Sequence, residues 1–334
     1  MRCSRVSAEF PFRKAVLLGV LFFLICGGLG YPILNRYDPG KTPGLSDARD
    51  YCQVVRQPVH FFSYRPLVPE LAKPFYWLAN GRIESWDPAL FGMLMASSLL
   101  TAATAVAIIA IGLRCGLSYR TSLVGAFLFL VNFAVPNWNL AAYIDSGEAF
   151  FLALVVWSLL AGRWWMLPFW AIPGSLAKET FAPFAFVYAV VWWIADRPRK
   201  PRRLAWIAAL GALGCITVLL SFASEGGLFA GAANYSVGMA EYVHVGFFHA
   251  LMRCLKAHEF WFTFLWLLPL GIWRLKRLDR RWLWATIATF VLALLFGAYN
   301  DALGNTARAL FNIAGPMLSL SVAALISGER SRTA

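Results

Sequence analysis

The sequence predicts an all-α, polytopic transmembrane protein of about ten spans. Three observations lead to this prediction. Of the 334 residues, 60% are hydrophobic, which is more than water-soluble domains usually carry. Apolar runs long enough to cross a bilayer recur from one end of the chain to the other. Basic residues gather in every second connection between these runs.

The predicted spans follow from the lengths of the apolar runs, because a helix needs about 20 apolar residues to cross the hydrocarbon core. The run from Trp164 to Ala195 is too long for one span and is interrupted near Pro173 and Lys178, so we divide it into two short helices. The spans are then 15–34, 89–113, 121–138, 147–162, 164–177, 181–195, 204–222, 260–273, 282–299 and 308–327. They form one transmembrane domain, 1–334, with no separate soluble domain.

The basic clusters predict the orientation of the chain. They include MRCSRVSAEFPFRK at the start, RPRKPRR at 197–203 and RLKRLDRR at 274–281. Short cytoplasmic loops are enriched in Lys and Arg, so both termini are expected in the cytoplasm. The net charge of +13 then reflects orientation in the membrane and not binding of nucleic acid. We expect a multi-pass protein of the cell membrane, in bacteria the inner membrane, surrounded by membrane lipids.

Two long connections, about 35–88 and 223–259, fall on the predicted outer face. The cytoplasmic connections are short, so we expect the functional residues on the outer face. Cys52 and Cys254 lie in these two connections and can pair in principle, but the sequence does not decide whether they do.

The first outer connection contains PGLSDARDYCQVV, which predicts an amphipathic helix in the membrane interface. Asp47, Asp50 and Tyr51 share one face of this helix, and the alternative for Asp47 is that it caps the helix start. Arg65 follows in a stretch rich in aromatic residues that suits the headgroup level. The prolines of this stretch predict several short pieces of helix.

Charged residues also stand next to or within the apolar runs. YIDSGEAFF places Asp145 and Glu148 on one helix face, where the alternative is an N-terminal capping pair. GSLAKETF places Lys178 and Glu179 at the turn between the two short helices. Each of these helices reaches only about 22 Å, so the turn is expected in a recess below the outer surface. It is either an anion site or a structural ion pair, and Arg308 is either an interfacial anchor or a phosphate ligand.

These segments resemble the GT-C superfamily of membrane glycosyltransferases, in the branch of the lipid A aminoarabinose transferase and the protein O-mannosyltransferases. SDARDYCQVVRQ is similar to the acidic motif of the first outer loop, with Asp47 at the acidic position and Ala48 where a second acid usually stands. SYRPLVPELAKPFYWL resembles the proline-aromatic segment that follows. YIDSGEAFFLALVVWSLLAG, GSLAKETF and NTARALFNIAGPML resemble the fourth span, a Lys-bearing turn and a late Arg-to-Pro segment.

The resemblance implies a GT-C-like fold and the transfer of a sugar from a polyprenyl-phosphate carrier to an acceptor on the outer face. Such a reaction needs a carboxylate for the acceptor hydroxyl and cations for the leaving phosphate. A Mg²⁺ or Mn²⁺ ion can bridge Asp47, Asp145 and the phosphate in such a site, and whether one is needed stays open. The assigned residues are Asp47 as base with Asp50 or Asp145 in support, Lys178, Arg65 and Arg308 at the phosphate, and Tyr51, Tyr143, Glu148 and Glu179 along the substrate.

Two other classes of protein fit part of the pattern. A transporter or flippase for a lipid-linked or anionic substrate also places charges at a broken helix pair. A non-catalytic membrane assembly protein would use the same charges as structural pairs. The sugar and the acceptor are not determined by the sequence under any of these hypotheses.

Overall fold

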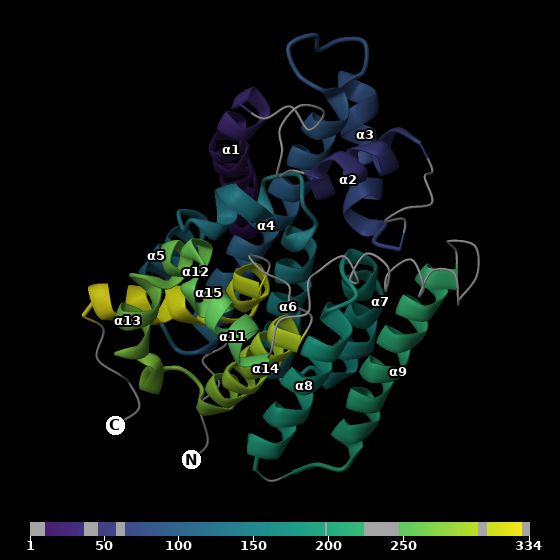
Figure 1. The fold of residues 1–334 in the computed structure, drawn as a ribbon. Coiled ribbons are helices and arrows are strands. Elements are labelled where there is room, and N and C mark those ends of the chain that lie inside the picture. The colour runs from purple at the N-terminus through teal and green to yellow at the C-terminus, as the bar shows by residue number, and fades with distance from the viewer. Residues whose placement is uncertain are drawn as a thin grey trace.

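The computed structural model describes residues 11–36, 46–57, 64–197, 199–223, 247–299 and 306–328. All regular elements within these ranges are helices, which confirms the predicted all-α class (Figure 1). The middle of the second predicted outer connection, 224–246, lies outside the described residues.

Five of the described helices are long and apolar enough to cross a membrane. They are α1 (Phe12–Arg36), α4 (Pro88–Arg114), α9 (Arg202–Ala223), α14 (Arg280–Tyr299) and α15 (Thr306–Ile326). Shorter apolar helices lie between them: α5 (Tyr119–Leu130), α6 (Asp145–Leu160), α7 (Leu167–Ala177) and α8 (Phe181–Ala195). The expected division of 164–195 into two short helices is therefore confirmed by α7 and α8.

Two other predicted spans are interrupted. In place of one helix over 121–138, α5 ends at Leu130 and a π-helical turn follows at Val135–Asn139. In place of 260–273 the chain forms α12 (His258–Phe264) and α13 (Leu267–Ile272). A proline ring excludes the carbonyl four residues earlier from a regular helix. Pro136 and Pro269 therefore account for the interruptions before them.

The described part of the first predicted outer connection folds against the body of the protein. The predicted amphipathic helix forms as α2 (Ser46–Arg56), and its apolar side chains are buried against α3 (Leu67–Ala79) and α4 instead of facing lipid. The prediction of several short pieces is wrong for α3, which is one helix that contains Pro69 and Pro74. Pro69 stands in the first turn, where no intrahelical bond needs its amide.

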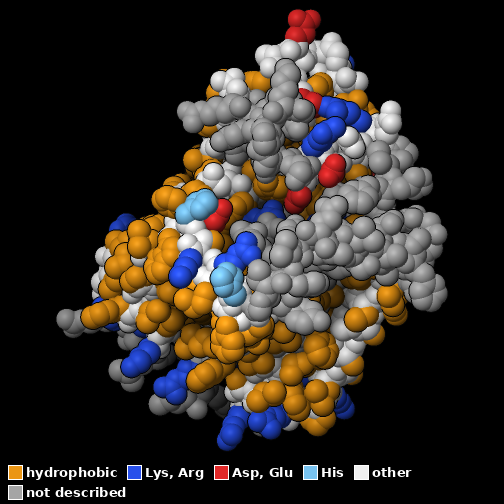
Figure 2. Space-filling model, viewed as in Figure 1, with side chains coloured by type: hydrophobic (Ala, Val, Ile, Leu, Met, Phe, Trp, Pro, Cys, Tyr) orange, Lys and Arg blue, Asp and Glu red, His pale blue; other side chains and the backbone are white. Residues whose placement is uncertain are grey.

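The centre of the protein is formed by α4 and α15. In the most apolar stretch of α15, 83% of the residues are buried, against 17% in that of α1. α4 packs against α1, α3, α5 and α6, while α15 packs against α5, α13 and α14. Large apolar side chains such as Phe12 and Leu220 are exposed on the peripheral helices α1 and α9. This apolar outer surface is compatible with a surrounding membrane (Figure 2).

Cys52 and Cys254 do not pair. Cys52 lies in α2 and Cys254 in α11 (Phe247–Lys256), and both are free and buried. The Sγ atom of Cys254 instead lies 3.4 Å from Oγ1 of Thr306 at the start of α15.

Candidate functional site

The first turn of α6 carries two buried carboxylates. Asp145 is 1% exposed and Glu148 is fully buried. The chain enters this helix through the π-helical turn and through Ala142, whose φ of 60° lies in the left-handed region. Both features are unusual backbone states that are often found at functional sites. They set the point at which α6 begins and thus the position of its two acids.

Lys178 binds both of these acids. Its Nζ atom lies 2.8 Å from Oδ1 of Asp145 and 3.2 Å from Oε2 of Glu148. The end of α7 approaches α6 closely because Gly147 has no side chain, and a Cβ atom there would lie 2.8 Å from Cβ of Ala177. The glycine therefore allows the turn after α7 to place its ammonium group over the two carboxylates.

Arg308, in the first turn of α15, joins α6 and α7 to α2. Its Nη1 atom lies 3.3 Å from Oδ2 of Asp145, and its Nη2 atom lies 4.0 Å from Oδ2 of Asp47 on α2. The guanidinium group also stacks over the ring of Tyr143 at 4.8 Å. One arginine thus connects acids from two segments that are far apart in the sequence.

A second ion pair lies next to the first. Arg65 binds Glu179 with two nitrogens, and its Nε atom lies 2.7 Å from Oε2 of that residue. The same guanidinium donates a hydrogen bond to Oη of Tyr51 at 2.7 Å. Lys178 and Glu179 are therefore not paired with each other. Each binds a different partner, so the turn is fixed to α6 on one side and to the chain just before α3 on the other.

The linked ion pairs form one network, which consists of Asp47, Arg65, Asp145, Glu148, Lys178, Glu179 and Arg308. Two further residues that contact this network were not identified from the sequence. Asn312 donates a hydrogen bond to Oε2 of Glu148 at 2.8 Å, and Thr180 donates one to Oε1 of the same carboxylate. Asn312 stands four residues after Arg308, on the same face of α15. That spacing was the available signal, but an amide in an apolar helix gives no indication of its partner.

The capping interpretation of Asp145 and Glu148 is wrong. Ile144 occupies the N-cap position of α6, and no side chain caps this helix end. The Asp145 carboxylate is bound by Lys178 and Arg308. Among the residues that the structure describes, Asp50 makes no hydrogen bond or ion pair with these groups, so its supporting role stays a prediction. Burial, followed by repulsion from Asp47, raises the pKa of Asp50.

Burial and charge oppose each other at the turn between α7 and α8. Burial alone would raise the pKa of Glu179, but the attraction and hydrogen bonds of Arg65 outweigh it, and the pKa lies below its usual value. Burial would lower the pKa of Lys178, yet Asp145 and then Glu148 hold it above its usual value. The bound partners Asp145, Glu148 and Arg65 thus favour the ionised forms, while the like charge of Arg308 opposes that of Lys178.

The exposure of the charged side chains is highest at Asp47. The side chain of Asp47 is 37% exposed, against 12% for Arg308 and 14% for Lys178. Figure 2 shows acidic and basic side chains gathered toward the middle of one face, above a largely hydrophobic region. Asp47 is the carboxylate of this network that is most open to a substrate.

The described residues do not form a metal site on their own. Across those ranges no three His, Cys, Asp or Glu side chains lie close enough together to hold a metal ion. Asp145, which the sequence suggested as a bridging ligand with Asp47, has both of its oxygens bound by cations.

No protein-family model matches this chain, and no curated protein matches it significantly.

Proposed function

We propose that this protein is an integral membrane glycosyltransferase that moves a sugar from a polyprenyl-phosphate carrier to an acceptor hydroxyl on the extracytoplasmic face. The observation that supports the proposal is the meeting of acids and cations from four separate segments. Asp47 of α2, Asp145 of α6, Lys178 of the α7–α8 turn and Arg308 of α15 form one continuous set of contacts. A general base and phosphate-binding cations must lie within a few ångströms of each other in such an enzyme.

Asp47 is the base in this proposal. It is the most exposed carboxylate of the network, and its contact with Arg308, at 4.0 Å, is longer than a hydrogen bond. Asp145 is unsuited to the role because Lys178 and Arg308 bind its two oxygens and stabilise its charge. We assign Asp145 and Glu148 to positioning the two cations, with Asn312 and Thr180 holding Glu148.

The reaction is a single displacement at the anomeric carbon. The acceptor oxygen forms a bond to that carbon while the bond from the carbon to the phosphate oxygen breaks. The hydroxyl proton passes to Asp47, and the carrier leaves as polyprenyl phosphate. Arg308, together with Lys178 and Arg65, stabilises the growing negative charge of the phosphate. A planar guanidinium group is well suited to this role. Inversion at the anomeric carbon follows from the single step.

The ten-span, GT-C-like arrangement belongs to the same proposal. Five long helices and the shorter apolar pieces α5, α6, α7, α8 and α12–α13 supply the spans. Of these pieces, α6, α7 and α8 carry or adjoin the charges of the site, as in proteins where broken helices line a polar cavity. Both termini and the arginine-rich α8–α9 connection are assigned to the cytoplasm of a bacterial inner membrane.

Replacing Asp47 tests this proposal. Lipid-linked sugars and surface glycans should be measured by mass spectrometry in cells with the wild-type chain, with Asp47→Asn and with no chain. Loss of a general base should reduce transfer by about 10²–10⁴-fold, so that the donor accumulates as in the deletion. Glu84→Gln is the matched control, because Glu84 is an exposed acid of the same outer connection that makes no contact with the network.

Two results would contradict the transferase. If Asp47→Asn leaves lipid-linked sugars and glycans as in wild type while Lys178→Ala stops movement of the lipid-linked substrate across the membrane, the protein is a transporter or flippase. If the deletion changes neither lipid-linked sugars nor glycans, the network has only a structural role.

A further inference from the structure

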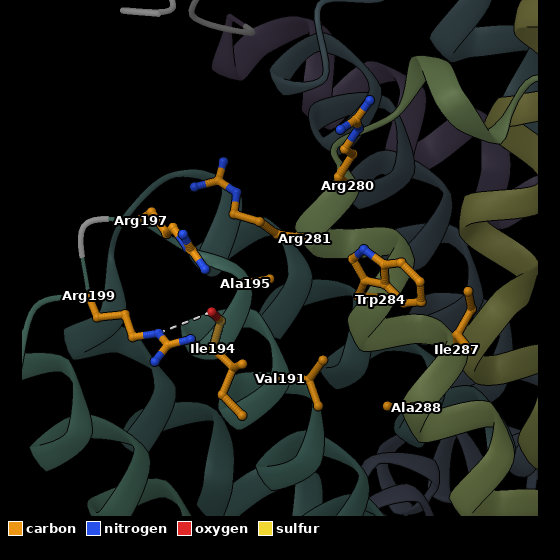
Figure 3. Close-up of a pocket in the computed structure, with 10 residues that line it drawn as sticks. All are labelled: Val191, Ile194, Ala195, Arg197, Arg199, Arg280, Arg281, Trp284, Ile287 and Ala288. Carbon is orange, nitrogen blue, oxygen red and sulfur yellow. Dashed lines mark hydrogen bonds between the residues drawn. The ribbon is translucent and has the colours of Figure 1, made fainter.

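A second polar region lies at the other end of α8. A pocket of about 760 Å³ opens between the C-terminal end of α8 and the N-terminal end of α14 (Figure 3). Its volume is within the range of small-molecule sites in proteins. The pocket is separate from the outer site, because Lys178 and Glu179 precede α8 whereas the pocket surrounds the residues that end it.

The lining of the pocket is divided into a basic end and an apolar wall. Figure 3 shows the side chains of Arg197, Arg199 and Arg281 on one side of the lining, with Arg280 at its edge and pointing away from them. The apolar part of the lining comes from Val191, Ile194 and Ala195 of α8 and from Trp284, Ile287 and Ala288 of α14. A ligand that fills it must therefore be anionic at one end and apolar along its length.

The basic end has more positive than negative charge. The neighbouring acids are already engaged, since Asp196 pairs with Arg203 and Arg281, and Asp279 pairs with Arg281. Arg197 and Arg280 are exposed and form no ion pair with the described residues. Two guanidinium groups are thus available for an anion at the mouth of the pocket.

We propose that this pocket binds an anionic phospholipid, with its anionic headgroup at the arginine-rich end that includes Arg197 and Arg280, and the upper acyl chain along Ile194 and Ile287. Basic pockets between transmembrane helices on the cytoplasmic side commonly recognise anionic lipids. The positive-inside rule assigns this end of α8 to that side. Arginines that only set the orientation of the chain in the membrane need nothing besides their charge. The apolar walls beside these arginines are an additional feature, and they match an acyl chain. This inference is independent of the proposed transferase activity.

Native mass spectrometry of the full chain tests the proposal. The protein should be released from nanodiscs of phosphatidylcholine that contain a minor fraction of phosphatidylglycerol, and the lipids that remain bound should be counted. Wild type is expected to retain phosphatidylglycerol selectively. In Arg197→Gln/Arg280→Gln this binding should weaken by roughly 25-fold, since each basic residue near an anionic lipid strengthens binding about fivefold.

Two further variants separate the pocket from general surface charge. Lys14→Gln/Arg120→Gln removes the same charge from exposed residues outside the pocket and should retain the lipid as wild type does. Ala288→Phe narrows the pocket without changing charge and should lose the lipid. Each variant is compared only when its elution and thermal unfolding match those of wild type.

Three results would overturn the proposal. Equal retention of phosphatidylcholine and phosphatidylglycerol by wild type would show that the pocket has no preference for an anionic lipid. Equal loss in the two arginine pairs would assign the effect to overall charge. Displacement of the bound lipid by inorganic phosphate alone, with Ala288→Phe unaffected, would identify a free-anion site instead.

Discussion

The two ends of α8 carry charge in different ways. At its N-terminal end the side chains of Lys178 and Glu179 are only 14% and 13% exposed and are bound to acids of α6 and to Arg65. At its C-terminal end Arg197 and Arg199 are exposed, and the basic residues there outnumber the acids. A charge inside a protein of this kind must be paired, because its desolvation costs several kcal/mol, while a charge at the surface keeps its water. The comparison predicts large effects at the first end and small ones at the second.

The largest effect is expected from Lys178→Ala. It leaves Asp145 and Glu148 buried without their shared cation, which should lower the free energy of unfolding by about 3–5 kcal/mol. Denaturant unfolding in detergent, followed by tryptophan fluorescence, measures this change. Lys178→Arg keeps the charge and should lose less. A loss below about 1 kcal/mol in Lys178→Ala would mean that water solvates the two acids.

A smaller effect is expected from the pair of Arg65 and Glu179. Each side chain is 13% exposed, and the pair has two hydrogen bonds, so a double-mutant cycle should give a coupling energy of about 1.5–3 kcal/mol. The cycle uses Arg65→Met, Glu179→Gln and the double variant. The more exposed pair of Arg56 and Asp87 is the matched control and should give about 0–1 kcal/mol. Equal coupling in both cycles would remove the distinction between buried and surface charge.

The same pair should make stability depend on pH. The folded-state pKa of Glu179 lies below its usual value of 4.5, so its contribution is present above that pH and is lost as the pH falls through the folded-state pKa. The free energy of unfolding should therefore decrease below about pH 4.5, and Glu179→Gln should decrease less steeply than wild type. Parallel curves for the two proteins between pH 7 and pH 3 would show that Glu179 is not stabilised by Arg65.

The smallest effect is expected at the arginine-rich end. Arg197→Gln removes an exposed charge that forms no ion pair with the described residues, so the free energy of unfolding in neutral detergent should change by less than about 0.5 kcal/mol. Its effect should be seen in lipid binding instead. A loss comparable to that of Lys178→Ala would show that Arg197 holds the fold together.

The fold was predictable where local sequence decides it. The apolar runs of α1, α4, α9, α14 and α15 predicted helices at nearly their observed bounds, because helix formation depends on residues close in the chain. The break between α7 and α8 was visible from the charges at its centre. The interruptions before Pro136 and Pro269 were missed. The runs that contain these prolines are largely apolar, so each run was assigned to a single span from its length.

The candidate site was predictable in its members more than in its contacts. Apart from Asp50, the predicted residues lie in or beside the two linked ion-pair groups. Their partners were not predictable: Lys178 and Glu179 are adjacent in the chain but bind different helices. Asn312 and Thr180 were missed, because a single polar side chain in an apolar helix has no local pattern that indicates its partner.

The sequence by itself determined the helical class, the apolar runs and the uneven distribution of basic residues, since each depends on composition over a few turns of chain. Only the tertiary structure decided that Arg308 reaches Asp145 and Asp47, and that Arg197 and Arg280 line one pocket. These contacts join residues that are far apart in the chain. They depend on how the helices pack, which for α6 and α7 is set by the space that Gly147 leaves open.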